Sequence, residues 1–495
     1  MMQRREFLKF TGGYATLAGL GSLGIPMDLF AGSTSSLTGY KALVVLLQHG
    51  GNDSLNMMIP SGTDVKKGYN NYASIRTSLA VANNDLTAGL SSSSSKLTLS
   101  SNPYVLNDSI RQAYTKGLYR HSTIDGLATN GVMPEFAHLV NQGKVAMVAN
   151  TGNLIQPTTK AEVDAKTATL PPYLYAHDNQ RKLLYNGEAS KLNRAGWAGL
   201  LADQWTGING SSVYGINISV RGVTHLLYGE NTTPLIVNPS GPTKYNGIQR
   251  NVYDTWLAIN QSEKFSSLYN KLRTNSFAVQ DTLVTDWTTN APTFSSTNAY
   301  GGELFSLPSK STLSIANSDN LNASLLQQFK AVAKLASIGK NSGLKRQIFY
   351  VAHGGYDTHS NQTQTHALRL RELSLALGDF QLALSDMGME NEVTTFNMSD
   401  FGRSVGNNGD GTDHAWGAHH FVVGGAVTGG LYGTLPDLTL SGEDDASNKG
   451  RLIPTTSMSQ YLGTIVKWFG ADEATLNGLF PERANFTQKD LGFMG

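Results

Sequence analysis

The chain has 495 residues, a net charge of +1 and only 15 % charged residues. This near-neutral charge argues against a nucleic-acid groove and against a polybasic membrane patch. The sequence contains no cysteine, which excludes thiolate metal ligands and thiol nucleophiles. Any metal would therefore be held by His, Asp, Glu or Asn, and these ligands favour hard or borderline divalent ions.

The first residues have the order of charges and apolar residues that is typical of a twin-arginine export signal. Arg4 and Arg5 precede Phe-Leu-Lys, and a modestly apolar, Gly- and Ala-rich stretch covers residues 11–25. We therefore expect a signal segment over residues 1–31 and the twin-arginine export machinery as a partner. The apolar stretch is shorter than the ~20 residues that span a bilayer. The small-residue pattern before a cleavage point at Ala31 is poor, so two locations stay open: a periplasmic or exported protein, and one anchored to the membrane through an uncleaved signal segment.

Strands and helices are expected to alternate along the rest of the chain. Four apolar runs predict buried parallel strands, over residues 41–47, 145–149, 347–352 and 393–397. Three stretches with apolar residues at i, i+3, i+4 and i+7 predict helices, over residues 325–338, 365–387 and 457–469. This alternation predicts an α/β fold with a mostly parallel sheet flanked by helices. Residues 40–495 are expected to form a single domain with loop-rich insertions around 63–107 and 207–308.

Ionisable side chains follow the predicted strands, at the sheet edge where ligands bind in such folds. Three of the 11 histidines lie in residues 409–425, GDGTDHAWGAHHFVVGG. If this segment ends in a strand, His419 and His420 point to opposite faces, and one supports the other's site. Carboxylates and imidazoles from separate strand ends suit zinc, manganese or iron. The sequence thus predicts a site for one or two divalent metal ions, held by Asp53, Asp357, His359, Asp400, His414 and His419.

Each of these residues also has a structural interpretation. Asp53 has good turn chemistry around it, and Asp357 with His359 can cap the helix that follows. Asp400 can form an ion pair with Arg403. The histidines of residues 409–425 can be packed in a core with satisfied ring nitrogens. Both interpretations stay open for every member of the set.

Four segments resemble an exported bacterial family known as domain of unknown function 1501, which is grouped with the alkaline phosphatase-like superfamily. They are residues 49–56 (HGGNDSLN), 354–362 (GGYDTHSNQ), 399–404 (SDFGRS) with 409–425, and 453–469. The resemblance implies an alkaline phosphatase-like mixed, mostly parallel sheet with a metal centre at its carboxyl edge. In the superfamily plan, Asp53 matches the aspartate after the first strand. Asp357 and His359 match a later aspartate–histidine segment. Asp400 matches the aspartate of an Asp-His pair, and His414 or His419 matches the final histidine.

Several residues depart from this plan. One residue separates Asp357 from His359, where the phosphatases have three, and Phe401 stands where a second-ion histidine is usual. Residues 174–180 (LYAHDNQ) have Ala176 where family members often have serine. If that serine is the nucleophile, this chain needs an activated water, with His177 or Asp178 as the general base. Arg403 is expected to bind the anionic group of the substrate.

Two functions from different classes follow. The first is an exported metal-dependent hydrolase of phosphate or sulfate esters, acting on an anionic small molecule or polymer. The second is a cell-envelope binding or assembly protein that keeps the fold but not the catalysis, which Ala176 and Phe401 favour.

Overall fold

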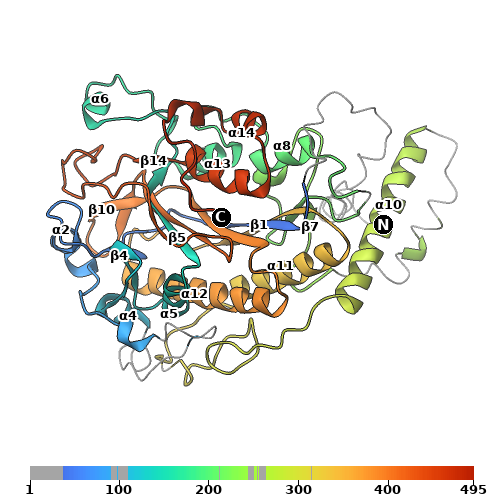
Figure 1. The fold of residues 1–495 in the computed structure, drawn as a ribbon, viewed down its shortest axis with the longest axis horizontal. Helices are drawn as coiled ribbons and strands as arrows, with labels where there is room; N and C mark the ends of the chain where they lie inside the picture. The colour runs from blue at the N-terminus through green and yellow to red at the C-terminus, as the bar shows by residue number, and fades with distance from the viewer. Residues whose placement is uncertain are drawn as a thin grey trace. The chain divides into compact units, whose positions relative to one another are not determined.

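The structure is a computed structural model and describes residues 37–90, 97, 110–210, 212–242, 250–252, 255, 264–313 and 315–495. It is a mixed α/β structure with a large, mostly parallel β-sheet flanked by helices (Figure 1). The predicted signal segment over residues 1–31 lies outside the described residues. The described residues divide into two units, a larger one within Leu43–Arg194, Phe294–Phe329 and Val351–Gly495, and a smaller one within Met1–Ala42, Ala195–Thr293 and Lys330–Tyr350.

In the larger unit the sheet runs in the order β13, β5, β12, β9, β1, followed by the carboxyl end of β8. Strand β12 is antiparallel to both β5 and β9, whereas β13 and β14 are parallel to β5. The strands are β1 (Lys41–Gln48), β5 (Val145–Gly152), β8 (Arg346–His353), β9 (Val393–Ser399), β12 (Ala418–Val423), β13 (Gly430–Tyr432) and β14 (Thr456–Ser457). Every residue of β5, β9 and β12 is buried, as expected for strands covered on both faces.

Helices cover both faces of this sheet in the larger unit: α5 and α12 lie on one face, and α13 and α14 on the other (Figure 1). The helices of this unit are α2 (Tyr69–Arg76), α4 (Ile110–Lys116), α5 (Pro134–Asn141), α6 (Lys160–Asp164), α7 (His177–Asn186), α12 (Gln362–Asp386), α13 (Met458–Phe469) and α14 (Glu473–Leu479). Two small sheets complete it: β10 (Arg403–Asn407) with β11 (Thr412–His414), and β2 (Met58–Pro60) with β4 (Ile124–Asn130) and β3 (Leu118–His121).

The smaller unit has its own strand pairs and helices. The amino-terminal part of β8 pairs in parallel with β6 (Asn217–Ser219), and β6 pairs in parallel with β7 (Leu235–Ile236). Its helices are α8 (Trp197–Gln204) and α10 (Lys264–Thr289). Helix α11 (Ser324–Asn341) begins in the larger unit and continues into the smaller one.

The strands and helices predicted from periodicity are present, with small shifts at their ends. The four apolar runs form β1, β5, β8 and β9, and the three amphipathic stretches form α11, α12 and α13. Local signals explain one of these ends, because Ser457 and Gln460 form a capping box that starts α13.

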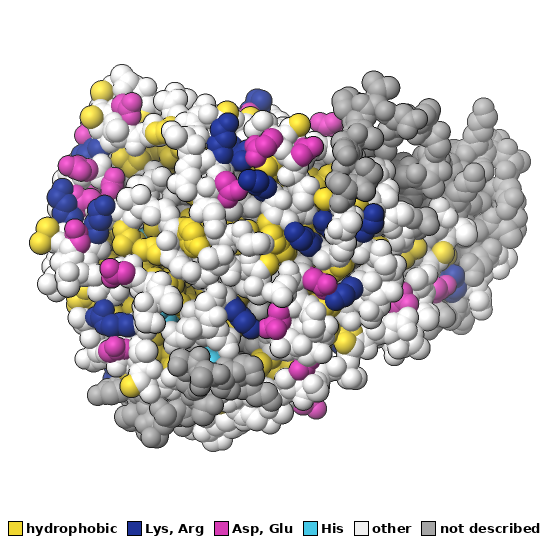
Figure 2. All heavy atoms as spheres, viewed as in Figure 1, with side chains coloured by type: hydrophobic (Ala, Val, Ile, Leu, Met, Phe, Trp, Pro, Cys, Tyr) yellow, Lys and Arg dark blue, Asp and Glu magenta, His cyan; other side chains and the backbone are white. Residues whose placement is uncertain are grey.

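Among the described helices, none is long and apolar enough to cross a membrane. On the face seen in Figure 2, basic and acidic side chains are interspersed over the described surface.

Candidate metal centre

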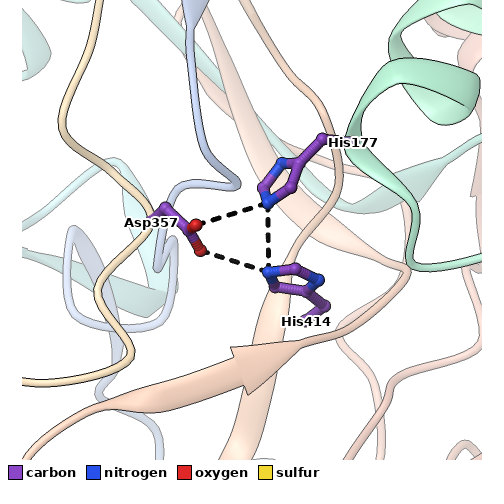
Figure 3. Close-up of side chains that lie close together, drawn as sticks. All are labelled: His177, Asp357 and His414. Carbon is purple, nitrogen blue, oxygen red and sulfur yellow. Dashed lines mark hydrogen bonds and ion pairs between the residues drawn. The ribbon is translucent and has the colours of Figure 1, made fainter.

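Three segments of the larger unit bring His177, Asp357 and His414 together (Figure 3). His177 is the first residue of α7, Asp357 follows β8, and His414 ends β11. One ligand atom from each residue lies within 4.8 Å of the other two. The Nε2 atoms of His177 and His414 are 3.1 Å apart, and the Asp357 carboxylate lies 3.1 Å from His414 Nε2 and 3.5 Å from His177 Nε2.

His359 adds a fourth side chain to this cluster. Its Nε2 lies 2.8 Å from His414 Nε2 and 3.1 Å from Asp357 Oδ1. Its Nδ1 faces the Asp413 carboxylate at 3.5 Å. The side chains of His359 and Asp357 are each 46 % exposed, so the cluster is open to solvent on that side. Catalytic metal sites keep such an open position, whereas structural ones are closed.

The partners of the outer ring nitrogens fix which nitrogen faces the cluster. His414 Nδ1 lies 2.9 Å from the Tyr175 carbonyl oxygen, and His177 Nδ1 lies 2.8 Å from Asp400 Oδ2. Both partners only accept, so each Nδ1 carries the proton. In the neutral rings, both Nε2 atoms then present lone pairs to each other and to Asp357. Such tethering of the outer nitrogen by a carbonyl or carboxylate is typical of metal-binding histidines.

A hydrogen bond alone satisfies this arrangement poorly. His414 Nε2 has three neighbours within 3.1 Å: His177 Nε2, His359 Nε2 and Asp357 Oδ1. If the His177 and His414 rings are neutral, their Nε2 lone pairs face each other, and the lone pair of His414 Nε2 also faces the Asp357 carboxylate oxygen. A divalent cation among the four side chains would relieve both of these contacts. The donor set of imidazole and carboxylate fits zinc or manganese.

The pKa values of the cluster residues shift in different directions. Burial lowers the pKa of His414 and favours its neutral form. Burial alone would raise the pKa of Asp357, but the Arg403 guanidinium, which donates to this carboxylate, outweighs burial and holds that pKa below its ordinary value. The hydrogen bond to Asp400 raises the pKa of His177 and so makes its ring a stronger base for a cation.

The backbone around His177 and Asp357 is unusual and tightly packed. Tyr175, whose carbonyl oxygen holds His414, has φ +71°, a left-handed conformation that is rare for a residue with a side chain. Gly50, which follows β1, has φ +114°, and a Cβ there would lie 2.4 Å from the Asp357 backbone nitrogen. Its N–H donates to Asp400 Oδ2 at 3.2 Å. The Gly-Gly turn after β1 therefore positions both the Asp357 loop and Asp400.

Phe401 packs against the cluster. Its ring centroid lies 4.6 Å from that of His177 and 4.6 Å from that of His414, and the residue is 5 % exposed. In place of the histidine that the superfamily resemblance implies, the chain thus has an apolar ring that contacts two imidazoles.

The two arginines near the cluster have different surroundings. The Arg403 side chain is fully buried and donates to Asp357 at 2.8 Å and to the Thr412 carbonyl oxygen at 2.5 Å. Arg181 lies one turn after His177 on α7, is 23 % exposed, contacts Asp400 Oδ2 at 3.5 Å and pairs with Asp178. Asp178 itself is 77 % exposed.

The structure places the other sequence-predicted ligands in buried contacts of their own. Arg76 binds both carboxylate oxygens of Asp53, at 2.6 and 2.9 Å. Burial alone would raise the pKa of Asp53, but the Arg76 guanidinium outweighs it and lowers that pKa. Asp400 is buried, and its carboxylate accepts a hydrogen bond from His177 Nδ1. His419 Nδ1 accepts from the Asn150 backbone N–H at 3.0 Å, and burial lowers the pKa of His419 to about 3.

Sequence reasoning found most of the cluster but missed two features. It named His177 as a base rather than as a member of the cluster, and it did not name Arg181. The spacing of Arg181 four residues after His177 on an expected helix was the available signal, since such residues share a face.

Fold and site together define an α/β protein with an imidazole- and carboxylate-lined surface site. Residues 329–463 match the family model described as "Protein of unknown function (DUF1501)". The match supports the family resemblance seen in the sequence and includes Asp357, His359 and His414, whereas His177 precedes it. None of the curated proteins compared with the chain matches it.

Proposed function

We propose that the protein binds a divalent cation between His177, Asp357, His359 and His414 and hydrolyses phosphate or sulfate esters. The observation that carries the proposal is the convergence on His414 Nε2 of two further imidazole nitrogens and a carboxylate oxygen. The finer fold assignment, an alkaline phosphatase-like sheet, is part of the same proposal. It is supported by the position of the cluster beyond the carboxyl end of β8, where ligands bind in α/β sheets.

The residues around the cluster have separate tasks in this proposal. A bound cation would supply Lewis acidity and lower the pKa of water. Asp400 orients the His177 ring, and Arg403, whose guanidinium is buried against Asp357, holds that carboxylate in place. We assign binding of the anionic ester to Arg181, because it is partly exposed and shares a helix face with His177. Since Ala176 offers no hydroxyl, the expected attacking group is water.

Export completes the proposal. The twin-arginine route carries proteins that are already folded, often around a cofactor, and therefore suits a protein that acquires its metal before leaving the cytoplasm. We accordingly place the protein in the periplasm or outside the cell, either free or held by its signal segment.

The test is turnover of a panel of aryl phosphates, phosphodiesters and aryl sulfates in the presence of zinc, manganese, magnesium or iron. We expect activity with at least one ester, and a loss of about a hundredfold or more in His414→Ala, because a metal ligand is removed. The matched control is His225→Ala, which removes an exposed histidine of the smaller unit and should keep full activity. Turnover that His414→Ala leaves unchanged would refute the proposal.

A second function, binding or assembly in the cell envelope without catalysis, is favoured by Ala176 and by Phe401. Both replace groups that the superfamily resemblance assigns to catalysis or to a second ion, and a protein that only binds its ligand needs neither. Stoichiometric metal without turnover of any ester in the panel would support a cell-envelope binding or assembly protein.

A further inference from the structure

Two segments carry three of the four cluster residues, and their backbones are joined beside the cluster. One is the loop over residues 357–361 that leads into α12, and the other is the β10–β11 hairpin. The Thr412 N–H donates to the Thr358 carbonyl oxygen, and the Gln362 N–H donates to the Asp410 carbonyl oxygen, both at 3.0 Å. The relative position of the ligands on the two segments therefore depends on what holds this junction.

The side chain of Gln362, the first residue of α12, lies inside the junction and is fully buried. Its Oε1 accepts from Thr358 Oγ1 at 3.1 Å and from Thr412 Oγ1 at 2.8 Å. Thr358 lies in the loop between two cluster residues, and Thr412 precedes His414 by two positions. One carboxamide oxygen therefore ties together both segments that bear cluster residues.

The ion pair of Asp53 with Arg76 fixes the orientation of this carboxamide. Gln362 Nε2 donates to Asp53 Oδ2, and both oxygens of that carboxylate also accept from Arg76. A carboxylate only accepts, so the amide nitrogen of Gln362 faces Asp53 and its oxygen faces the two hydroxyl groups. Asp53 and Arg76 are 1 % and 0 % exposed. Because a buried charge requires its partner, the anchor of Gln362 is itself held in place.

Arg403 extends this chain of donors to the cluster. Its Nε donates to Thr412 Oγ1 at 3.3 Å, and its terminal nitrogen donates to Asp357 at 2.8 Å. From Arg403 through Thr412 and Gln362, each group donates to the next, and the chain ends at the carboxylate of Asp53. Aligned hydrogen bonds of this kind strengthen one another in a buried site. Reversing the Gln362 amide would place its oxygen against the carboxylate, so the chain permits one orientation of that side chain.

We propose that Gln362 is a positioning residue, which holds His414 against the loop over residues 357–361 and thereby raises the affinity of the cluster for a divalent cation. Asp53 and Arg76 anchor this amide from the other side. The inference rests on the proposed metal site and assigns to Asp53 a role that acts through Gln362 rather than through the ion.

Gln362→Met tests the proposal, because methionine has nearly the same volume but lacks the amide. Competition with a chromogenic chelator should give a zinc affinity about tenfold below that of the wild type, as for other residues that hold metal ligands in place. The visible spectrum of the cobalt(II)-loaded protein, which reports the ligand geometry, should change as well.

The matched control is Gln328→Met. Gln328 is also buried, and its amide bonds to both backbone groups of Ala352, so its loss should destabilise the fold to a similar extent. We expect this control to keep the zinc affinity and the cobalt spectrum of the wild type. A zinc affinity of Gln362→Met equal to that of Gln328→Met would overturn the proposal.

A milder pair of variants decides the question if Gln362→Met does not fold. Thr358→Val keeps the side-chain shape and removes the hydroxyl group that bonds to Gln362, and it should weaken zinc binding about fivefold. Thr358→Ser keeps that hydroxyl group and should bind zinc as the wild type does. Equal zinc affinity in Thr358→Val and Thr358→Ser would count against the proposal.

A measurement without metal separates this inference from the proposed metal site. Hydrogen exchange at the Thr412 amide, followed by mass spectrometry, should be about tenfold faster in Gln362→Met than in Gln328→Met, because the junction opens more often. If the wild type binds no zinc, the proposed function fails and this exchange decides the inference. Faster exchange then supports the positioning of His414 by Gln362, and equal exchange in the two variants overturns it.

Discussion

Asp400 and His177 illustrate how a single buried carboxylate shapes the candidate metal centre. Asp400 holds His177 Nδ1 at 2.8 Å and is itself held by the Gly50 N–H. The hydrogen bond fixes the ring tautomer and raises the pKa of His177. Both effects make His177 Nε2 a better ligand.

Asp400→Asn tests this role. The amide has nearly the same shape but no charge, so we expect the affinity for zinc to fall by about 10- to 100-fold, as for other carboxylates behind a metal-bound histidine. The measurement is competition with a chromogenic chelator. Asp386→Asn, which changes a carboxylate bonded to Ser296 at the far end of α12, should leave the affinity within about twofold of the wild type. Equal zinc affinity in Asp400→Asn and wild type would show that Asp400 has no such role.

For single residues, the sequence predicted which side chains lie near the site better than it predicted the role of each one. Asp400 and Asp53 were expected to be ligands, but whether a carboxylate faces a cluster or an arginine depends on partners far along the chain. The Arg76 guanidinium that binds Asp53 lies on α2, and nothing in the local pattern around Asp53 specifies it. The role of His177 likewise depends on Asp400, which is 223 positions away.

Among the elements, the β10–β11 hairpin positions His414. Its register places Arg403 opposite His414, so one hairpin supplies both an imidazole and the guanidinium that holds Asp357. The hairpin packs against the His359 loop, since the Thr412 N–H donates to the Thr358 carbonyl oxygen at 3.0 Å. At Gly411, a Cβ would lie 2.4 Å from the His359 backbone.

Gly411→Ala should therefore displace the His359 loop from the hairpin. We expect a loss of stability of about 1–3 kcal/mol from overpacking and a zinc affinity reduced by about tenfold, because His359 moves away from His414. Thermal unfolding and zinc titration measure the two effects. The control is Gly478→Ala in α14, where a Cβ has open space around it. If Gly411→Ala binds zinc as tightly as Gly478→Ala does, the loop is not a positioning element.

Elements themselves were largely predictable, whereas their contacts were not. Continuous apolar runs and 3.6-residue periodicity are local signals, and they located β1, β5, β8 and β9 as well as α11, α12 and α13. The contacts of Gly50 with the Asp357 loop and of Gly411 with the His359 loop join distant segments. No periodicity encodes such contacts, so the sequence could indicate glycine-rich strand ends but not which loops meet there.

For the molecule as a whole, the main prediction from sequence was that the carboxyl ends of distant strands meet. The α/β class followed from the alternation of strands and helices, and the structure has the large, mostly parallel sheet that was expected. The cluster residues come from α7, from the loop after β8 and from β11, and all lie in the larger unit.

The most direct test is the metal content of the purified protein. The protein would be stripped with a chelator, dialysed against zinc or manganese and analysed by inductively coupled plasma mass spectrometry beside a His177→Ala/His414→Ala double variant. The account predicts about one tightly bound ion per wild-type chain and essentially none in the double variant, because two of the four ligands are lost. A folded wild-type protein without stoichiometric metal, or a double variant that retains it, would contradict the account.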